Sequence, residues 1–231
     1  MKTAIITGAT GNLGQAIIRE MLEQGYRVYG TLVPNDPVKL TITSPQLQTR
    51  EVNLLEEASA ETFVQSVINE SSQIDAAVLT VGGFAMGDIG STSSADILKQ
   101  YKLNFETAYH IARPLFLQMK KQGSGRIFMV GSRPGDLMQN SKGMVAFGLS
   151  KSLVFRLAEL MNDEAAGTDV VTSVIVPSTI DTPQNRKSMP DADFTKWVSP
   201  EHIGKVVSFI AAKMPLPYAS PSFVYTIMPS I

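Results

Sequence analysis

The sequence contains no cysteine, which excludes disulfide bonds, thiolate zinc sites, iron–sulfur clusters and a cysteine nucleophile. Its two histidines, His110 and His202, argue against a histidine-based metal site or a Ser–His–Asp triad. The 20 basic and 21 acidic residues nearly cancel, so the basic excess typical of proteins that bind nucleic acid or acidic membranes is missing. No apolar run approaches the ~18 residues of a membrane span, and residues 1–8 are too short for a signal peptide. We therefore expect a cytoplasmic protein.

Short apolar runs alternate with longer amphipathic stretches along the 231 residues. The short runs are typical of buried strands and lie at residues 4–7, 28–33, 47–52, 76–81, 127–130, 170–176 and 223–227. The amphipathic stretches are typical of helices and lie at about residues 13–25, 57–71, 95–122, 145–166 and 201–213. This alternation predicts one doubly wound, Rossmann-type α/β domain over residues 1–231, with a mostly parallel seven-stranded sheet.

Two long segments between these elements are candidate ligand loops. Residues 82–94 are rich in glycine and serine, and residues 177–199 have prolines near both ends. Both follow strands and would lie beyond the carboxyl ends of the sheet, where ligands bind in folds of this kind. We therefore expect these two loops to hold a small-molecule substrate.

A glycine-rich loop comes directly after the first predicted strand and opens the first predicted helix. Its sequence is Thr7-Gly8-Ala9-Thr10-Gly11-Asn12-Leu13-Gly14. Glycines let the backbone turn tightly and approach a pyrophosphate, which rests on the exposed amides and positive dipole end of the helix. A glycine-rich turn that only packs the strand against the helix is the alternative, but the strand–loop–helix context favours a dinucleotide site.

At this loop the chain resembles the short-chain dehydrogenase/reductase superfamily, and the resemblance covers nearly its whole length. That superfamily carries a T-G-x-x-x-G-x-G loop, which Thr7, Gly8 and Gly14 match, whereas Asn12 replaces the middle glycine. Gly11 instead gives the T-G-x-x-G-x-x-G spacing of the epimerase-like branch, but that branch usually has a larger C-terminal substrate region than 231 residues allow, so we do not expect the chain to belong to it. The resemblance implies hydride transfer between a nicotinamide and a carbonyl or alcohol, with NAD or NADP bound at this loop.

Two further motifs of the superfamily are only partly present. Its N-N-A-G stretch after the fourth strand corresponds to Leu79-Thr80-Val81-Gly82, in which Gly82 alone matches. Its P-G-x-x-x-T motif after the sixth strand corresponds to the stretch from Pro177 to Thr182. By resemblance, Thr182 would hydrogen-bond the carboxamide of the nicotinamide.

The sequence leaves the choice between NAD and NADP open. NAD enzymes place an acid at the end of the second strand, roughly 20 residues past the glycines, and that position is Leu32 here. Asp36 lies farther on in an Asn-Asp-Pro turn, which favours its interpretation as a turn residue. NADP enzymes place an arginine near this point, and the segment offers only Lys39. Asn53 also replaces the aspartate often found after the third strand.

The resemblance assigns catalytic roles to three residues. Ser132, at the end of the fifth strand, would hold the substrate's carbonyl oxygen, although a strand-end cap is the simpler interpretation. Lys151 would bind the nicotinamide ribose and lower the pKa of a tyrosine one helical turn before it; a solvated surface lysine is the alternative. Asn104 would position a water in the proton relay, and asparagine is a poor former of helix interiors, although an exposed polar position would also explain it.

The tyrosine position of the superfamily's Y-x-x-x-K motif is occupied by Phe147. Phenylalanine keeps the ring but has no hydroxyl to donate a proton. Three explanations remain open. The tyrosine was changed deliberately to trap a complex, the natural enzyme takes its proton from water, or the chain is a non-catalytic sensor or scaffold that binds a dinucleotide.

The two predicted substrate loops are similar in wording to the dihydropteridine reductases, a short-chain subfamily that reduces quinonoid dihydropterin. The similar segments are residues 180–194, continuing to Trp197, and residues 82–87. An aromatic and a methionine on glycine-hinged loops can pack on a flat heterocycle, although both segments also close the edge of the sheet. The superfamily resemblance further implies a homodimer or homotetramer formed through the helices at 95–122 and 145–166, which carry more apolar surface than one face buries.

Overall fold

The structure is a computed structural model that describes residues 1–136, 141–213 and 223–228. Seven strands form one parallel sheet in the order β3-β2-β1-β4-β5-β6-β7. The strands are β1 (Thr3–Thr7), β2 (Arg27–Leu32), β3 (Leu47–Glu51), β4 (Ala76–Leu79), β5 (Ser124–Val130), β6 (Asp169–Pro177) and β7 (Phe223–Ile227). The predicted Rossmann-type α/β fold with seven strands is confirmed, and all the strands are parallel.

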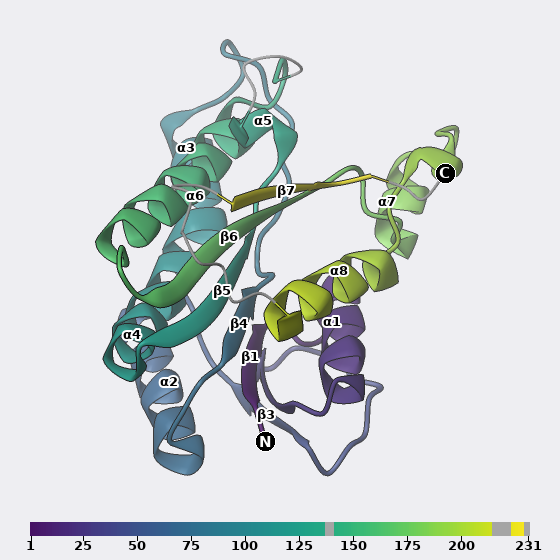
Figure 1. Cartoon of the computed structure of the whole chain (residues 1–231). Helices are drawn as coiled ribbons and strands as arrows, with labels where there is room; N and C mark the ends of the chain where they lie inside the picture. Colours follow the sequence, from purple (N-terminus) through teal and green to yellow (C-terminus); the bar gives the residue numbers. More distant parts are fainter. Residues whose placement is uncertain (137–140, 214–222, 229–231) are drawn as a thin grey trace.

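Helices cover both faces of this sheet (Figure 1). The pair α1 and α8 lies side by side on one face, and α2, α3, α4 and α6 lie on the other. The α-helices are α1 (Asn12–Glu23), α2 (Glu57–Ser71), α3 (Ser94–Tyr101), α4 (Thr107–Gln122), α5 (Arg133–Asp136), α6 (Val145–Glu164), α7 (Pro183–Ser188) and α8 (Pro200–Lys213). Within the described ranges, no helix combines the length and apolar character that crossing a membrane requires.

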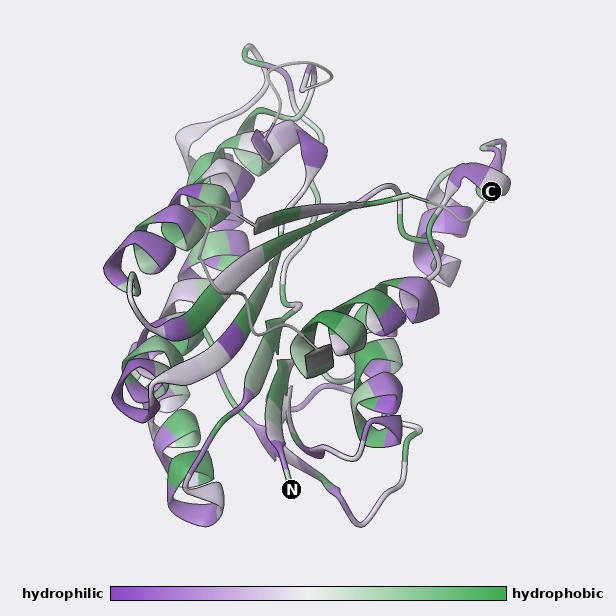
Figure 2. Ribbon diagram, viewed as in Figure 1, coloured by the Kyte–Doolittle hydropathy of each residue, from purple (hydrophilic) through white to green (hydrophobic). Residues whose placement is uncertain are grey.

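The sheet separates two hydrophobic clusters. On one face, Ile111 and Leu115 of α4 pack with Ile127 of β5, and all three side chains are fully buried. On the other face, Ile17 of α1 packs with Val207 of α8 in a second cluster. Figure 2 shows hydrophobic residues along the central strands and through α8, and this burial on both faces explains why the strands are nearly continuous apolar runs.

The predicted single helix over residues 95–122 is interrupted. A π-helix, η1 (Lys102–Glu106), lies between α3 and α4 and contains Asn104. A π-bulge adds about one residue to a turn, which barely disturbs the 3.6-residue spacing of the apolar side chains, so the sequence pattern does not reveal it. π-Bulges occur frequently at functional sites.

The predicted loop at 177–199 is partly helical. It contains α7 and the 3₁₀ helix η2 (Phe194–Lys196). Thr182 caps α7, because its Oγ1 accepts a hydrogen bond from the Asn185 amide at 3.1 Å, and Pro183 occupies the first helical position. The other predicted loop begins earlier than expected, since β4 ends at Leu79 and leaves Thr80 and Val81 outside the strand.

Candidate active site

The order of the strands places the predicted site residues at one edge of the sheet. Strand order reverses between β1 and β4, and in open α/β sheets ligands bind beyond the carboxyl ends of the strands at such a point. The glycine-rich loop leaves β1 at this point, and the loop that contains Gly82 leaves β4 beside it. Ser132 and Pro177 stand at the ends of the next two strands, β5 and β6.

The glycine-rich loop has the backbone geometry of a phosphate cradle. Gly8 has a φ of +66°, and Gly11 donates a backbone hydrogen bond to the Gly8 carbonyl at 3.0 Å. A Cβ on Gly14 would overlap that same carbonyl, so only glycine fits there. The helix α1 begins at Asn12, and its N-cap residue, Gly11, has no side chain that could accept a hydrogen bond from the first amides of the helix. Its first amides are therefore available to an anionic group, and the loop fits a dinucleotide.

Two threonines join the ends of β1 and β4 beneath this loop. The Thr80 amide donates to Thr7 Oγ1 at 3.0 Å, and Thr80 Oγ1 donates to the Thr7 carbonyl at 2.6 Å. Thr7 is fully buried, so its side chain fixes the two strand ends rather than facing a ligand. Sequence comparison with N-N-A-G found only Gly82 matching, but Thr80 supplies a hydrogen-bonding group at this stretch.

Asp36 contacts the glycine-rich loop, which the sequence did not indicate. Its Oδ1 accepts from the Val38 amide at 2.9 Å, as a turn residue does, but its Oδ2 also accepts from Thr10 Oγ1 at 2.9 Å. The Asp36 carboxylate therefore lies against the glycine-rich loop. Asp36 comes four residues after Leu32, the half-buried residue that ends β2. In the sequence Asp36 lies beyond the position expected for the ribose-binding acid, but the turn that contains it brings its carboxylate back to Thr10.

Asn53 has local partners in this structure. Its Oδ1 accepts from the Leu55 amide at 3.2 Å and its Nδ2 donates to Glu56 Oε1 at 2.8 Å. These contacts shape the turn that precedes α2.

Asn104 is 1% exposed and connects three parts of the site. Its Oδ1 accepts from the Gly83 amide at 2.9 Å, and its Nδ2 donates to the Gly83 carbonyl at 3.0 Å. The Nδ2 also lies 2.8 Å from Gln100 Oε1 and 3.1 Å from Ser150 Oγ. The alternative of an exposed asparagine does not apply, and the amide holds the start of the β4 loop against η1 and α6.

Lys151 is buried rather than solvated, at 6% exposure. Its Nζ donates to the carbonyl of Val130, at the end of β5, over 2.8 Å. A Cβ on Gly82 would lie only 3.2 Å from this Nζ and would overlap Asn104 Oδ1, so Gly82 leaves room for both polar groups. Burial lowers the pKa of Lys151 from 10.5 to about 8, because the charged ammonium is removed from water.

Two serine hydroxyls are buried at neighbouring strand ends without a hydrogen-bond partner in the described part of the chain. Ser132 follows β5, and Ser178, which the sequence analysis did not select, follows β6. Buried hydroxyls are normally paired, so an orphaned pair at adjacent strand ends indicates a place for a ligand's polar groups. This fit, together with the glycine-rich loop, suits a nicotinamide dinucleotide.

Phe147 belongs to an aromatic pair at the mouth of the site. It is 8% exposed, and its ring meets that of Phe84 edge to face, with centroids 5.0 Å apart. Phe84 itself is 60% exposed on the β4 loop. The Gly87 amide donates to the Gly143 carbonyl at 2.8 Å, and this contact ties the same loop to the segment just before α6.

The C-terminal loop is braced by its own charged and aromatic side chains. Arg186 forms a bidentate ion pair with Asp181 at 2.6 and 2.7 Å, and its guanidinium lies 4.5 Å from the centroid of the Phe194 ring. The Phe194 ring also packs on Trp197, with centroids 4.7 Å apart. Arg186 therefore has local partners, while Thr182 Oγ1, the expected nicotinamide contact, keeps its hydroxyl proton free for donation because it accepts from Asn185.

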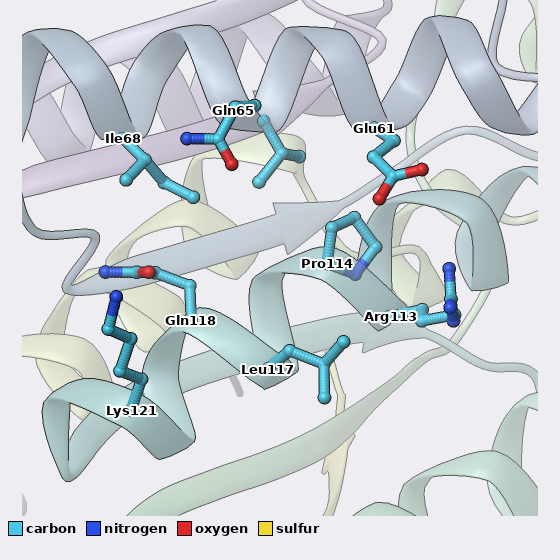
Figure 3. A pocket seen from close by; sticks show the side chains of 9 residues that line it. Glu61, Gln65, Ile68, Arg113, Pro114, Leu117, Gln118 and Lys121 are labelled. Carbon is cyan, nitrogen blue, oxygen red and sulfur yellow. The ribbon is translucent and has the colours of Figure 1, made fainter.

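A cavity of about 210 Å³ lies away from these residues, between α2 and α4 (Figure 3). Its lining comprises Glu61, Val64, Gln65 and Ile68 from α2 and Arg113, Pro114, Leu117, Gln118 and Lys121 from α4. None of the residues that line it is a predicted site residue, so this cavity is separate from the candidate active site.

Comparison with known proteins identifies a family. The short chain dehydrogenase family model matches residues 2–193. An acetoacetyl-CoA reductase of Acinetobacter sp. (strain RA3849) is 25% identical over 189 residues, which cover 79% of this chain and 75% of that protein. A cyclic-di-GMP-binding biofilm dispersal mediator protein of Escherichia coli (strain K12) is 25% identical over 217 residues, which cover 91% of this chain and 89% of that protein.

Solved structures share the fold. ElxO with NADP bound superposes with a TM-score of 0.86 at 18% sequence identity, covering 98% of this chain and 96% of that chain. A tyrosine-to-phenylalanine variant of ElxO, with NADPH bound, has the same TM-score and identity. At this identity the likeness concerns the fold.

The burial of Lys151 predicts a pH-dependent effect on stability. Below pH 8 the lysine is charged in both the folded and unfolded states, so its burial destabilises the fold fully. Between pH 8 and 10.5 the folded state loses the proton first, and this cost disappears. Replacing Lys151 with the apolar methionine should therefore raise the free energy of unfolding at pH 7 by up to about 3 kcal/mol.

Urea unfolding of Lys151→Met at pH 7, 8, 9 and 10 checks this expectation. The gain over the wild type should be largest at pH 7 and should narrow toward pH 10. Lys102→Met, which changes an exposed lysine, serves as the control and should show little difference at any pH. A less stable Lys151→Met protein at pH 7 would show that the hydrogen bond to Val130 outweighs the burial of the charge.

Proposed function

Since the chain belongs to the short-chain dehydrogenase family, whose members are NAD(P)-dependent oxidoreductases, we propose that it transfers hydride between a nicotinamide and a small ring-containing substrate. The observation that carries this proposal is that a buried lysine lies near one edge of the sheet together with two buried serine hydroxyls that have no hydrogen-bond partner among the described residues. A fold that used this edge only for packing would leave such groups paired or replace them with apolar side chains.

The bound cofactor supplies the hydride, and the residues of the chain bind and orient the reactants. The first amides of α1 and the glycine-rich loop would hold the pyrophosphate. Lys151 would hold the nicotinamide ribose, and Thr182 would donate to the carboxamide. Ser132 Oγ, which is buried and has no partner in the described part of the chain, would donate a hydrogen bond to the substrate atom that gains negative charge during reduction. Asn104 would fix the position of the β4 loop relative to Lys151, because its side chain hydrogen-bonds both the amide and the carbonyl of Gly83.

The aromatic pair supports a flat substrate. The rings of Phe84 and Phe147 meet edge to face one helical turn before Lys151, and Met86 on the loop that carries Phe84 is 69% exposed. A conjugated heterocycle gains contact with such side chains without needing many polar partners. The similarity of two loop segments to dihydropteridine reductases points to a pterin-like ring, and a small carbonyl compound is the simpler substrate of the same chemistry.

A function without turnover is the second candidate, and Phe147 is the observation that favours it. This residue removes the proton donor that a carbonyl reduction normally needs. One similar protein, the biofilm dispersal mediator protein from E. coli, is named for binding a nucleotide, cyclic-di-GMP. Under this hypothesis the glycine-rich loop would still bind a dinucleotide, and the chain would act as a sensor or scaffold.

We further propose that this chain prefers NAD. The Asp36 carboxylate, which accepts a hydrogen bond from Thr10 of the glycine-rich loop, would accept hydrogen bonds from ribose hydroxyls and would repel a 2′-phosphate. The nearest cation in sequence, Lys39, is exposed and forms no ion pair or hydrogen bond within the described residues. ElxO binds NADP, but its similarity to this chain concerns the fold.

An assembly through α3, α4 and α6 is also proposed. Tyr101, Phe105 and Tyr109 stack along one side of the helical segment α3–η1–α4, with successive centroids 5.4 and 6.0 Å apart. Leu149 and Leu160 on α6 are 53% and 51% exposed. Such stripes of large apolar residues on neighbouring helices are typical of surfaces buried in a homodimer or homotetramer.

The Phe147→Tyr variant tests the proposed function. It adds a hydroxyl one helical turn before Lys151, so the reduction of quinonoid dihydropterin or a small carbonyl should rise by roughly 10²–10⁴-fold in kcat. Oxidation of NADH or NADPH followed at 340 nm measures the change. Phe209→Tyr, which adds the same hydroxyl to an exposed side chain of α8, should leave the rate unchanged. A Phe147→Tyr protein that binds cofactor but reduces none of these compounds would favour the sensor or scaffold hypothesis.

The Asp36→Asn variant tests the cofactor preference. The amide removes the negative charge and keeps one acceptor oxygen for the Val38 amide, while its NH2 group can donate to Thr10 Oγ1 in place of the carboxylate oxygen that accepted from it. We expect wild-type protein to bind NADH more tightly than NADPH, and Asp36→Asn to bind NADPH at least tenfold more tightly than the wild type does. Titration of cofactor fluorescence gives both dissociation constants. Equal binding of NADPH by the two proteins would exclude a role for this carboxylate.

A glutamate in place of Leu149, one of the exposed leucines of α6, tests the assembly. Light scattering after size exclusion should show a dimer or tetramer for the wild type and a monomer for Leu149→Glu, because a charge cannot be buried at the interface without a partner. Leu117→Glu is the matched control, since Leu117 is equally exposed but faces the cavity between α2 and α4. A wild-type monomer at micromolar concentration would contradict the proposal.

A further inference from the structure

We propose that Lys151 is the proton donor of the reduction in this chain, taking the place of the absent tyrosine hydroxyl. This inference rests on the proposed oxidoreductase function and assigns the acid to a residue that otherwise only binds ribose. It begins with the position of the Nζ atom. The ammonium has three N–H groups, and in the described structure one of them is used, for the Val130 carbonyl.

The remaining N–H groups lie next to the substrate-binding edge. Val130 ends β5, and the unpaired Ser132 hydroxyl comes two residues later, so Nζ and this hydroxyl share one strand end. On its other side Nζ borders Gly82, an exposed residue that has no side chain to cover it. A substrate oxygen or nitrogen that accepts from Ser132 is therefore placed at the same strand end as the lysine ammonium.

The surroundings of Lys151 suit a group that releases its proton near neutral pH. Phe147, one turn earlier on α6, contributes a ring without a hydroxyl, and the amides of Asn104 and Gln100 are neutral. The charged residues on α6 and on the elements packed against it are Asp96 and Lys99 on α3, Lys102 and Glu106 on η1, Arg133 and Asp136 on α5, Arg126 on β5, Asp169 on β6, and Arg156, Glu159, Asp163 and Glu164 on α6 itself.

None of these charged groups is recorded as an ion pair or hydrogen-bond partner of Nζ in the described residues, and burial is the cause of the lowered pKa. A general acid works best when its pKa lies near the operating pH. At pH 7 a lysine with a pKa of about 8 is mostly protonated and still releases its proton far more readily than a free lysine. A phenol without a neighbouring cation would be a weaker donor, because its usual pKa is about 10.

The step balances with groups already named. The bound cofactor would supply a hydride with its electron pair, so that a C–H bond of the reduced nicotinamide would break, the nicotinamide would be oxidised, and a C–H bond would form at the electrophilic carbon of a C=O or C=N group. The π electron pair of that group moves to its oxygen or nitrogen, which takes a proton from Lys151 Nζ. One N–H bond breaks and one O–H or N–H bond forms. The neutral amine then regains a proton from water.

Chemical rescue tests the role of the lysine. Lys151→Ala removes the amine and leaves a buried space, and we expect kcat to fall by roughly 10²–10⁴-fold. Added ethylammonium should restore part of the rate in proportion to its concentration. Guanidinium, which carries the same charge but does not release a proton, should restore none. Lys142→Ala, an exposed lysine before α6, should keep the wild-type rate and show no response to the amine.

Two further readouts separate proton donation from ribose binding. The wild-type kcat should fall above about pH 8, and in rescued Lys151→Ala this limb should move toward the pKa of the added amine. Lys151→Arg keeps the positive charge, so its dissociation constant for the cofactor should stay within a few-fold of the wild type while its kcat falls as far as that of Lys151→Ala.

The outcomes distinguish this inference from the function on which it rests. If the wild type turns over substrate and Lys151→Arg is also active, the acid role is overturned and the oxidoreductase function stays in place. The same conclusion follows if Lys151→Ala binds cofactor normally but the added amine restores none of its rate. A wild type and a Phe147→Tyr protein that both bind cofactor but reduce no substrate overturn the function, and the acid role with it.

Discussion

The candidate site depends on one buried amide that must satisfy its hydrogen bonds. Asn104 holds both backbone groups of Gly83 and also reaches Gln100 and Ser150, so it connects the β4 loop, α3 and α6. Because an unpaired amide in a dry interior costs free energy, these three elements cannot shift independently. The π-helix at residues 102–106 is the local distortion that brings the amide to this position. The backbone of Gly82 is thereby fixed beside the lysine, with no Cβ to separate them.

The replacement of tyrosine by phenylalanine changes the site in two ways. It removes a hydroxyl that would hydrogen-bond and donate a proton, and it leaves an apolar ring that pairs with Phe84. Burial is the cause of the lowered pKa of Lys151, one helical turn after this ring. The phenylalanine therefore removes the usual acid beside a lysine whose pKa is already lowered by burial.

Sequence reasoning reached the fold, because the fold follows from patterns along the chain. Alternating apolar runs and amphipathic stretches predicted the parallel sheet, and the strand ends indicated where the glycine-rich loop and Ser132 would lie. Lys151 was selected by resemblance to the Y-x-x-x-K motif, and its role in the site stays a prediction. The contacts of Asp36 with Thr10 and of Thr80 with Thr7 were not predictable, because each joins residues whose approach depends on how two loops cross in space. The orphaned hydroxyl of Ser178 was also missed, since pairing is a property of surroundings and not of residue type.

The presence of the buried lysine is itself an argument about function. A charged ammonium in an apolar interior with one hydrogen bond destabilises the fold, and a methionine of similar length would fill the space without that cost. In a site with a tyrosine, the lysine is explained by its effect on the phenol. Here no phenol stands one turn before it, so that explanation fails, and holding a ribose hydroxyl requires a hydrogen bond rather than a group that titrates near neutral pH. A lysine that both contacts the cofactor and releases a proton accounts together for the burial, for the one hydrogen bond that its Nζ makes within the described residues, and for the lowered pKa.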